Sequence, residues 1–324
     1  MAVYTQLSAQ EIQALADRAG IGRVTSIQPV AAGVENTTYF LGAEGTSIGS
    51  AAQSEYVLTI AETISAEDLG FIAELCDLLF LHGMPVPAPL RGFNNNAVFM
   101  LANKPAMMVP RMPGTHPTHP TIAQCRSIGA ALGRLHQVTQ AANFDHASHR
   151  SLNWVTTTGA SLLDYLPPTD WMLLSRELVF LDTFSATNTQ LPQGVIHGDL
   201  FCDNSLFLND KLTAIIDFFS AGTGFLLLDL AIAANDWCRL DDTFLPAQLH
   251  ALSAGYISVR PLTPAEIDAW PHLLRIGALR FWVSRLAEVH IGDAVRPPRQ
   301  RKDPNEYRQL LLNHRDNPLQ WQIH

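Results

Sequence analysis

The chain has 324 residues, of which 47% are hydrophobic and 16% charged, and its formal net charge at pH 7 is -9. This apolar content is sufficient for two packed lobes without disulfide or metal cross-links. Only three lysines are present in the acidic chain. Nucleic-acid binding requires clustered cations, so no nucleic-acid partner is expected and a small-molecule ligand is favoured.

The cysteines and the apolar runs predict a cytoplasmic protein without a membrane span. Four cysteines lie far apart with no CxxC pair, which fits reduced thiols. Ser8 and Glu11 predict a capping box before a first helix, in place of a signal peptide. The longest apolar run, near Phe225 to Ala234, contains Asp229 and is shorter than the roughly 20 residues that cross a bilayer.

The N-terminal third predicts a small sheet with a helix. Alternating and apolar runs indicate strands, and a Ser-x-x-Asp start with a His-Gly end indicates a helix. The expected strands are 27–30, 37–41, 56–60, 98–101 and 107–109, and the expected helix is 65–80. A glycine turn over 31–36 joins the first two strands.

Prolines and glycines cluster between Pro105 and Pro120, where they interrupt regular structure and indicate a hinge. We expect an N-terminal lobe over 1–107 and a larger, mostly helical lobe over 108–324. Helical spacing of apolar residues predicts helices at 122–138, 176–184 and 226–237. The predicted fold class is therefore α+β.

The most informative segment lies in the second lobe. An apolar strand leads into Asp199, Asn204 stands five residues later, and a hairpin with the turn Asn209-Asp210 returns the chain to Asp217. This order is typical of a phosphotransferase catalytic loop, which orients a hydroxyl and neutralises phosphate charge. Asp199 is the candidate proton acceptor, and Asn204 and Asp217 are candidate oxygen ligands for Mg²⁺. We expect His197 and Asp229 to have structural roles.

These segments resemble the aminoglycoside phosphotransferase and choline kinase superfamily, and more narrowly its homoserine kinases, almost from end to end. The superfamily resemblance rests on His197-Gly198-Asp199 with Asn204, Ile216-Asp217-Phe218 and Leu228-Asp229-Leu230-Ala231. The narrower resemblance rests on segments such as 33–39, 67–69, 194–197, 235–238, 255–256 and 302–307.

The resemblance implies a two-lobed protein-kinase-like fold, ATP and Mg²⁺ as cofactors, and phosphorylation of the side-chain hydroxyl of L-homoserine in threonine biosynthesis. Kinase-like folds carry a phosphate-binding lysine on the third strand, where this chain has Thr59. Nucleotide contacts are then expected from Thr59 and from the backbone of Gly33, Val34, Glu35 and Asn36, a possible anion nest.

An acceptor with an ammonium and a carboxylate requires an acidic side chain for the ammonium and paired N–H donors, such as a guanidinium, for the carboxylate. The candidates are Asp236, Arg280 and Arg285, and ordinary salt bridges on a helix face are the alternative for each. Two other functions stay open: a kinase of another hydroxylated amine or sugar, such as choline or an aminoglycoside, and a nucleotide-binding relative without catalytic activity. An aromatic cage in place of arginines favours choline. No feature of the sequence specifies an oligomeric state.

Overall fold

The computed structural model describes residues 4–30, 36–44, 53–241, 243–291 and 302–322. The chain divides into two compact units, Met1–Pro113 and Gly114–His324. The expected boundary between 107 and 108 lies within a strand of the first unit, which continues to Pro110.

The described part of unit 1 is an antiparallel sheet with two helices. Its elements are α1 (Ala9–Ala19), β1 (Arg23–Pro29), β2 (Thr37–Glu44), β3 (Gln53–Ile60), α2 (Ala66–Leu81), β4 (Phe99–Leu101) and β5 (Lys104–Pro110). The five strands are ordered β1-β2-β3-β5-β4. Capping boxes begin both helices, from Ser8 to Glu11 and from Ser65 to Asp68, because each serine and its acid satisfy two end N–H groups reciprocally.

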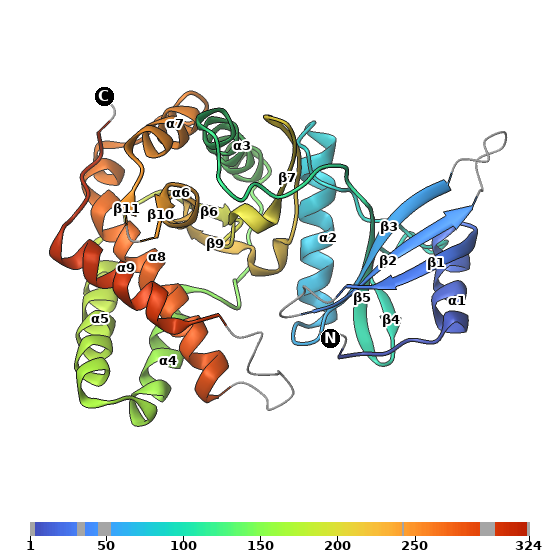
Figure 1. Ribbon diagram of the computed structural model, residues 1–324, viewed down its shortest axis with the longest axis horizontal. Coiled ribbons are helices and arrows are strands. Elements are labelled where there is room, and N and C mark those ends of the chain that lie inside the picture. Colours follow the sequence, from blue (N-terminus) through green and yellow to red (C-terminus); the bar gives the residue numbers. More distant parts are fainter. Residues whose placement is uncertain (1–3, 31–35, 45–52, 242, 292–301, 323–324) are drawn as a thin grey trace. The chain divides into compact units, whose positions relative to one another are not determined.

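Strand alternation places the core of unit 1 on one face of the sheet. Leu41, Leu58 and Ile60 are buried there against Ile12 and Leu15 of α1. Figure 1 shows the sheet between α1 and α2. Each predicted strand lies largely within an observed one. The observed strands β1, β2, β3 and β5 are longer at one or both ends than predicted, and β4 is one residue shorter than the predicted 98–101.

Unit 2 is mostly helical. Its helices are α3 (Ile122–Ala141), α4 (Leu152–Leu162), η1 (Leu163–Tyr165), α5 (Pro168–Thr187), η2 (Cys202–Asn204), η3 (Phe218–Ser220), α6 (Leu226–Trp237), α7 (Pro246–Ile257), α8 (Pro264–His290) and α9 (Pro304–Asp316). Its short strands are β6 (Gln193–Ile196), β7 (Ser205–Leu208), β8 (Lys211–Ile215), β9 (Gly222–Phe225), β10 (Arg239–Leu240) and β11 (Thr243–Phe244). The predicted α+β class, with a small N-terminal sheet and a larger helical part, is confirmed.

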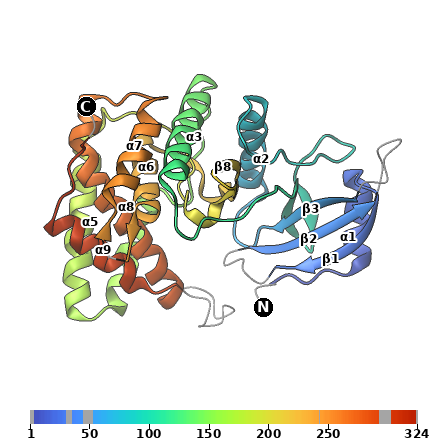
Figure 2. The ribbon, with the colours of Figure 1, turned by 45° about the horizontal axis from the view of Figure 1, so that its top comes forward.

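Helix α6 lies at the centre of unit 2. Every residue of this helix except Asp236 is buried. Helices α3, α7 and α8 pack against it (Figure 2). Glycines let α3 and α7 approach closely: a Cβ on Gly129 would lie 1.9 Å from the Leu252 carbonyl oxygen, and one on Gly255 would lie 2.1 Å from that of Arg126. These two positions therefore exclude any side chain.

Three predicted helices of unit 2 are present, and α6 has the predicted bounds. Helix α3 extends three residues further than expected, to Ala141, and the helix expected over 176–184 lies within the longer α5. Helices α4, α7 and α9 were not predicted. Within the described residues, no helix is both long and apolar enough to cross a membrane.

Candidate active site

A sharp turn delivers the candidate catalytic loop from strand β6. Strand β6 pairs antiparallel with β9, and the chain turns at Gly198, whose φ is 76°. A Cβ at Gly198 would lie 2.8 Å from the Ser220 carbonyl oxygen. Both the left-handed backbone and the close approach require glycine here.

Asp199 and Asn204 meet at the end of this loop. The Asn204 Nδ2 donates to the Asp199 carbonyl oxygen (2.8 Å) and to its carboxylate Oδ2 (3.2 Å). Asn204 is buried and Asp199 is half-buried. One amide therefore fixes both the backbone and the side chain of Asp199.

Asp217 is joined to the same loop through its neighbour. The Ile216 N–H donates to the Asn204 carbonyl oxygen (3.0 Å), and Asp217 follows with a left-handed φ of 65° and an exposed side chain. The hairpin of β7 and β8 thus brings Asp217 back beside Asn204. The structure brings the three predicted catalytic residues to one end of one hairpin.

The buried side chain of His197 holds the catalytic loop through two hydrogen bonds. Its Nδ1 accepts the Asp199 N–H (3.2 Å), and its Nε2 contacts the Ile216 carbonyl oxygen (3.0 Å), so Nε2 carries the proton. Burial lowers the pKa of His197, and the charge of Arg280 also acts in that direction. A neutral ring fits both contacts.

Asp229 of α6 holds the start of the loop. Its carboxylate accepts the N–H groups of His197 (2.7 Å) and Gly198 (2.8 Å) and contacts Nε2 of His136 (3.1 Å). Burial alone would raise the pKa of Asp229, but these partners outweigh it and the net shift is downward. The buried carboxylate is therefore charged and fully paired.

The contacts of Asp229 continue through the interior. Nδ1 of His136 lies 2.8 Å from the Tyr256 hydroxyl, which accepts a hydrogen bond from Arg260 (3.1 Å). Arg260 in turn pairs with Glu266 (2.8 Å), which completes the capping box of α8. This buried chain links the loop to α3, α7 and α8, and sequence reasoning missed it. Its only local signal is a histidine on the apolar face of the predicted helix over 122–138.

The three candidate acceptor residues have different positions. Asp236 accepts the Cys202 N–H (2.7 Å), and burial raises its pKa. Arg280 donates to the Gly198 carbonyl oxygen (2.6 Å), so both residues contact the catalytic loop. Arg285 instead donates to the Asp303 carbonyl oxygen and to Glu306 at α9, each at 2.7 Å.

Beside Asp236 lies a cluster of aromatic rings with cations on their faces. The ring centroids of Phe201 and Phe281 are 4.6 Å apart, and Tyr307 lies 5.2 Å from Phe281. The Arg285 guanidinium lies 4.4 Å from the Tyr307 ring, and Lys302 lies 5.5 Å from Phe201. The Tyr307 hydroxyl is buried and has no hydrogen-bond partner among the described residues.

The predicted nucleotide contacts belong to unit 1. Gly33, Val34 and Glu35 lie outside the described residues. Asn36 accepts the Glu62 N–H through Oδ1 (3.2 Å). Thr59 pairs with Thr38 and Met107 in the sheet, on the face opposite the α1 core.

Lys104 of β5 forms an ion pair next to the end of β3. It binds Glu62 and donates to the Thr5 hydroxyl (3.0 Å). Burial would raise the pKa of Glu62, but Lys104, Thr37 and Thr5 outweigh it and the net shift is downward. Through this ion pair, Thr5 of the N-terminal segment is connected to Thr37, which follows the expected anion nest and donates to Glu62.

The candidate metal ligands fit a cation shared with phosphates. Among the described residues, no group of three histidine, cysteine or acidic side chains gathers as a metal site. Asn204 uses its Nδ2 on Asp199, which leaves its amide oxygen for a cation beside Asp217. Two hard oxygen ligands suit Mg²⁺ that completes its shell with phosphates and water.

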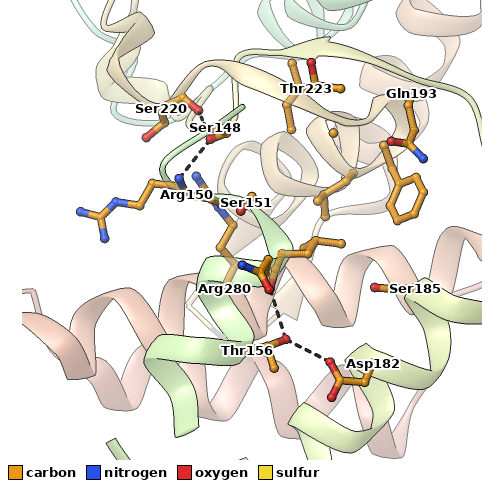
Figure 3. A pocket seen from close by; sticks show the side chains of 16 residues that line it. Ser148, Arg150, Ser151, Thr156, Asp182, Ser185, Gln193, Ser220, Thr223 and Arg280 are labelled. Atoms are coloured by element: carbon orange, nitrogen blue, oxygen red, sulfur yellow. Dashed lines mark hydrogen bonds between the residues drawn. The ribbon is translucent and has the colours of Figure 1, made fainter. Parts of the chain in front are cut away.

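Unit 2 also contains a cavity of about 410 Å³ next to the catalytic loop. Figure 3 shows Arg280 and the segment 148–151 on one side, Asp182 and Ser185 of α5 on another, and Gln193 and Thr223 on a third. Ser148 donates to the Ser220 carbonyl oxygen (3.2 Å) at its edge.

The sequence is similar to known phosphotransferases over most of its length. Residues 26–262 match the phosphotransferase enzyme family. A homoserine kinase of Pseudomonas aeruginosa is 38% identical over 298 residues, covering 91% of this chain and 92% of that protein. A homoserine kinase of Neisseria meningitidis serogroup B is 36% identical, with coverages of 97% and 99%.

Solved structures share the fold at low sequence identity. Amicoumacin kinase hAmiN, in complex with AMP-PNP, Ca²⁺ and Ami, superposes with a TM-score of 0.68 at 17% identity, over 96% of this chain and 97% of that one. A microcompartment-associated aminopropanol kinase gives a TM-score of 0.61 at 16% identity, with coverages of 94% and 96%. The chain is therefore an enzyme of the phosphotransferase family and belongs, within that family, with the homoserine kinases.

Proposed function

We propose that this enzyme transfers the γ-phosphoryl group of ATP to the side-chain hydroxyl of L-homoserine, which gives O-phospho-L-homoserine. The observation that carries the reaction type is the contact of Asn204 with Asp199, because the carbonyl oxygen of the same Asn204 accepts the N–H of Ile216, the residue before Asp217. Near-full-length similarity to homoserine kinases supports the choice of acceptor.

Asp199 is the proposed proton acceptor. The Asn204 hydrogen bond fixes its carboxylate, so a bound hydroxyl meets an oriented oxygen. In a loose transition state the proton leaves the attacking oxygen late, and orientation then contributes more than basicity. The hydroxyl oxygen attacks the γ-phosphorus, its proton passes to Asp199, and ADP leaves.

Asn204 and Asp217 are the proposed ligands of Mg²⁺. The bound ion would neutralise charge on the phosphates and align them. Asn36, Thr59 and the segment 33–35 remain the predicted nucleotide contacts of unit 1. Since Thr59 stands where related folds carry lysine, backbone N–H groups and the metal would have to supply most of the positive charge for the phosphates.

The charges near Asp236 favour an acceptor with a carboxylate over a quaternary amine. Arg285 and Lys302 already lie over the faces of Tyr307 and Phe201, so a choline headgroup would meet like charge there. An amino acid can place its ammonium at Asp236 and its carboxylate toward these cations. This supports homoserine, and with it a place in threonine biosynthesis.

A cytoplasmic location is part of the same proposal. All four cysteines are free thiols, which fits a reducing compartment.

The test is ADP release with a panel of acceptors: L-homoserine, choline, ethanolamine, simple sugars and aminoglycosides. We expect L-homoserine to give the highest kcat/KM. A higher kcat/KM with choline or an aminoglycoside would mean that L-homoserine is not the preferred acceptor, but the proposed phosphoryl transfer would stand. Absence of ADP release with every member would favour the non-catalytic alternative.

A further inference from the structure

The cavity beside the catalytic loop does not coincide with the proposed acceptor site. Its lining does not include Asp199, Asn204, Asp217 or Asp236, although the transferring hydroxyl must reach Asp199. Its volume of about 410 Å³ lies in the range of small-molecule sites. A molecule bound there would therefore be a second ligand and not the phosphoryl acceptor.

The lining carries opposite charges on different sides. Arg280 of α8, only 5% exposed, contributes a cation at one side. Asp182 of α5 contributes a carboxylate at another side, where it accepts a hydrogen bond from Thr156 (3.2 Å). Guanidinium groups bind carboxylates well, and a carboxylate binds an ammonium, so the charges fit a zwitterion.

The lining is also partly apolar. Leu152, Ile196, Phe225 and Leu228 contribute hydrocarbon surface to it. Such a surface stabilises a short aliphatic side chain by removing it from water. The combined chemistry is that of a small aliphatic α-amino acid.

Two hydrogen bonds connect the lining to the catalytic residues. Arg280 donates to the carbonyl oxygen of Gly198, the residue before Asp199 (2.6 Å). Ser148 donates to the carbonyl oxygen of Ser220, three residues after Asp217 (3.2 Å). A ligand that draws Arg280 or Ser148 toward itself would weaken these bonds and shift both segments.

We propose that this cavity binds a small aliphatic α-amino acid, and that its occupancy changes turnover through Arg280 and Ser148. The amino acid is an effector with no covalent role.

The first experiment measures binding and does not require kinase activity. Glycine, L-alanine and L-2-aminobutyrate are suitable probes because none has a hydroxyl that can accept a phosphoryl group. Isothermal titration is combined with amide hydrogen exchange of the peptides that cover 148–156 and 182–185. We expect at least one probe to protect both peptides.

Matched variants test the site. Asp182→Asn removes the carboxylate and should weaken binding at the cavity about tenfold or more, the usual effect of losing one charged hydrogen bond. Ser185→Phe fills the cavity from the same helix and should abolish protection. Asp164→Asn makes the same charge change at an exposed position outside the lining and should leave protection unchanged.

The second experiment tests coupling, and it rests on the proposed kinase activity. At saturating L-homoserine, the binding probe should change kcat severalfold in the wild type and in Asp164→Asn, but not in Asp182→Asn. Purely competitive inhibition, equal in all three proteins, would assign the probe to the acceptor site and overturn the proposal.

Two further outcomes are decisive. Absence of protection at 148–156 with every probe overturns the binding site, whether or not the enzyme phosphorylates homoserine. Protection without any change in kcat overturns the coupling. A protein that binds the probes at the cavity but phosphorylates another acceptor would contradict only the proposed function.

Discussion

At the scale of single residues, the candidate catalytic carboxylate is held by one neighbour. Asn204 contacts both the carbonyl oxygen and the carboxylate of Asp199. We expect Asp199→Asn to lower kcat by several orders of magnitude, because the amide cannot accept the proton of the attacking hydroxyl. Nucleotide affinity should change little, since the proposed metal ligands remain. ADP release and calorimetric titration of ATP with Mg²⁺ measure the two effects.

The matched control is Asp203→Asn in the same loop. Asp203 is exposed and lies 3.6 Å from Lys302, so its loss removes one negative charge from the loop and keeps Asp199. The control should retain wild-type kcat within a few fold. Equal activity of Asp199→Asn and the wild type would remove Asp199 from the mechanism.

Asp217 has a backbone conformation that few residues adopt. Its φ of 65° turns an exposed carboxylate out at the end of β8. We expect Asp217→Ala to weaken binding of ATP in the presence of Mg²⁺ by tenfold or more, with a smaller effect when the metal is removed by a chelator. Calorimetric titrations with and without Mg²⁺ measure this difference, and unchanged affinity would contradict the metal role.

Spacing in the sequence was sufficient to identify the candidate catalytic residues but not their support. Asp199, Asn204 and Asp217 follow a local order along one loop and one hairpin, which a linear pattern can record. Arg280 instead bonds a backbone carbonyl 82 positions away, and Lys104 pairs with Glu62 across the sheet. Such partners depend on tertiary packing, and composition or periodicity does not reveal them.

At the scale of elements, the crossing of α3 and α7 depends on glycine. A Cβ at Gly129 would overlap the Leu252 carbonyl oxygen, and no flexible side chain can move aside there. Gly129→Ala should therefore destabilise the protein by about 1–3 kcal/mol or more, as overpacking does. Chemical unfolding in urea measures the loss.

Gly70→Ala is the counterpart in α2. Nothing lies within 4 Å of its added Cβ, so the change should stabilise the protein by about 0.5–1 kcal/mol through helix propensity. A Gly129→Ala protein as stable as the wild type would mean that α3 and α7 can separate without loss.

Helices with a regular apolar stripe or a long apolar run were predictable, and the others were not. Helices α3 and α6 have regular apolar spacing and were located closely. Helix α4 contains three consecutive threonines and a glycine, which lower helix propensity, so tertiary packing of Val155 and Leu162 forms it. In unit 1, pairing with neighbouring strands lengthens β1 and β2 beyond the residues that alternate.

At the scale of the whole molecule, buried neutral histidines predict sensitivity to acid. Burial lowers the pKa of His136 and His197, and burial followed by the charge of Arg239 lowers that of His314 to about 4. Below pH 6.5 the unfolded chain binds protons that the folded chain does not. The free energy of unfolding should therefore fall as pH decreases, by about 1.4 kcal/mol per pH unit for each such histidine.

His314→Gln provides the comparison. Nε2 of His314 lies 2.8 Å from the Asn235 amide oxygen, and glutamine can supply an N–H to that acceptor without titrating. Urea unfolding between pH 7 and about pH 4 should show a smaller decrease in the free energy of unfolding for the variant, because one proton fewer is taken up on unfolding. Parallel curves for the two proteins would show that His314 does not contribute.

The position of Asp229 makes the conformation of the catalytic loop depend on packing in the interior of unit 2. Its helix has almost no surface in contact with water, so the carboxylate that fixes His197 and Gly198 comes from the middle of unit 2. Loosening anywhere around that helix would release the turn before the chain lost its helical content. On mild heating, phosphoryl transfer should therefore stop at a lower temperature than the one at which circular dichroism changes. Turnover would then report how tightly the interior of unit 2 is packed.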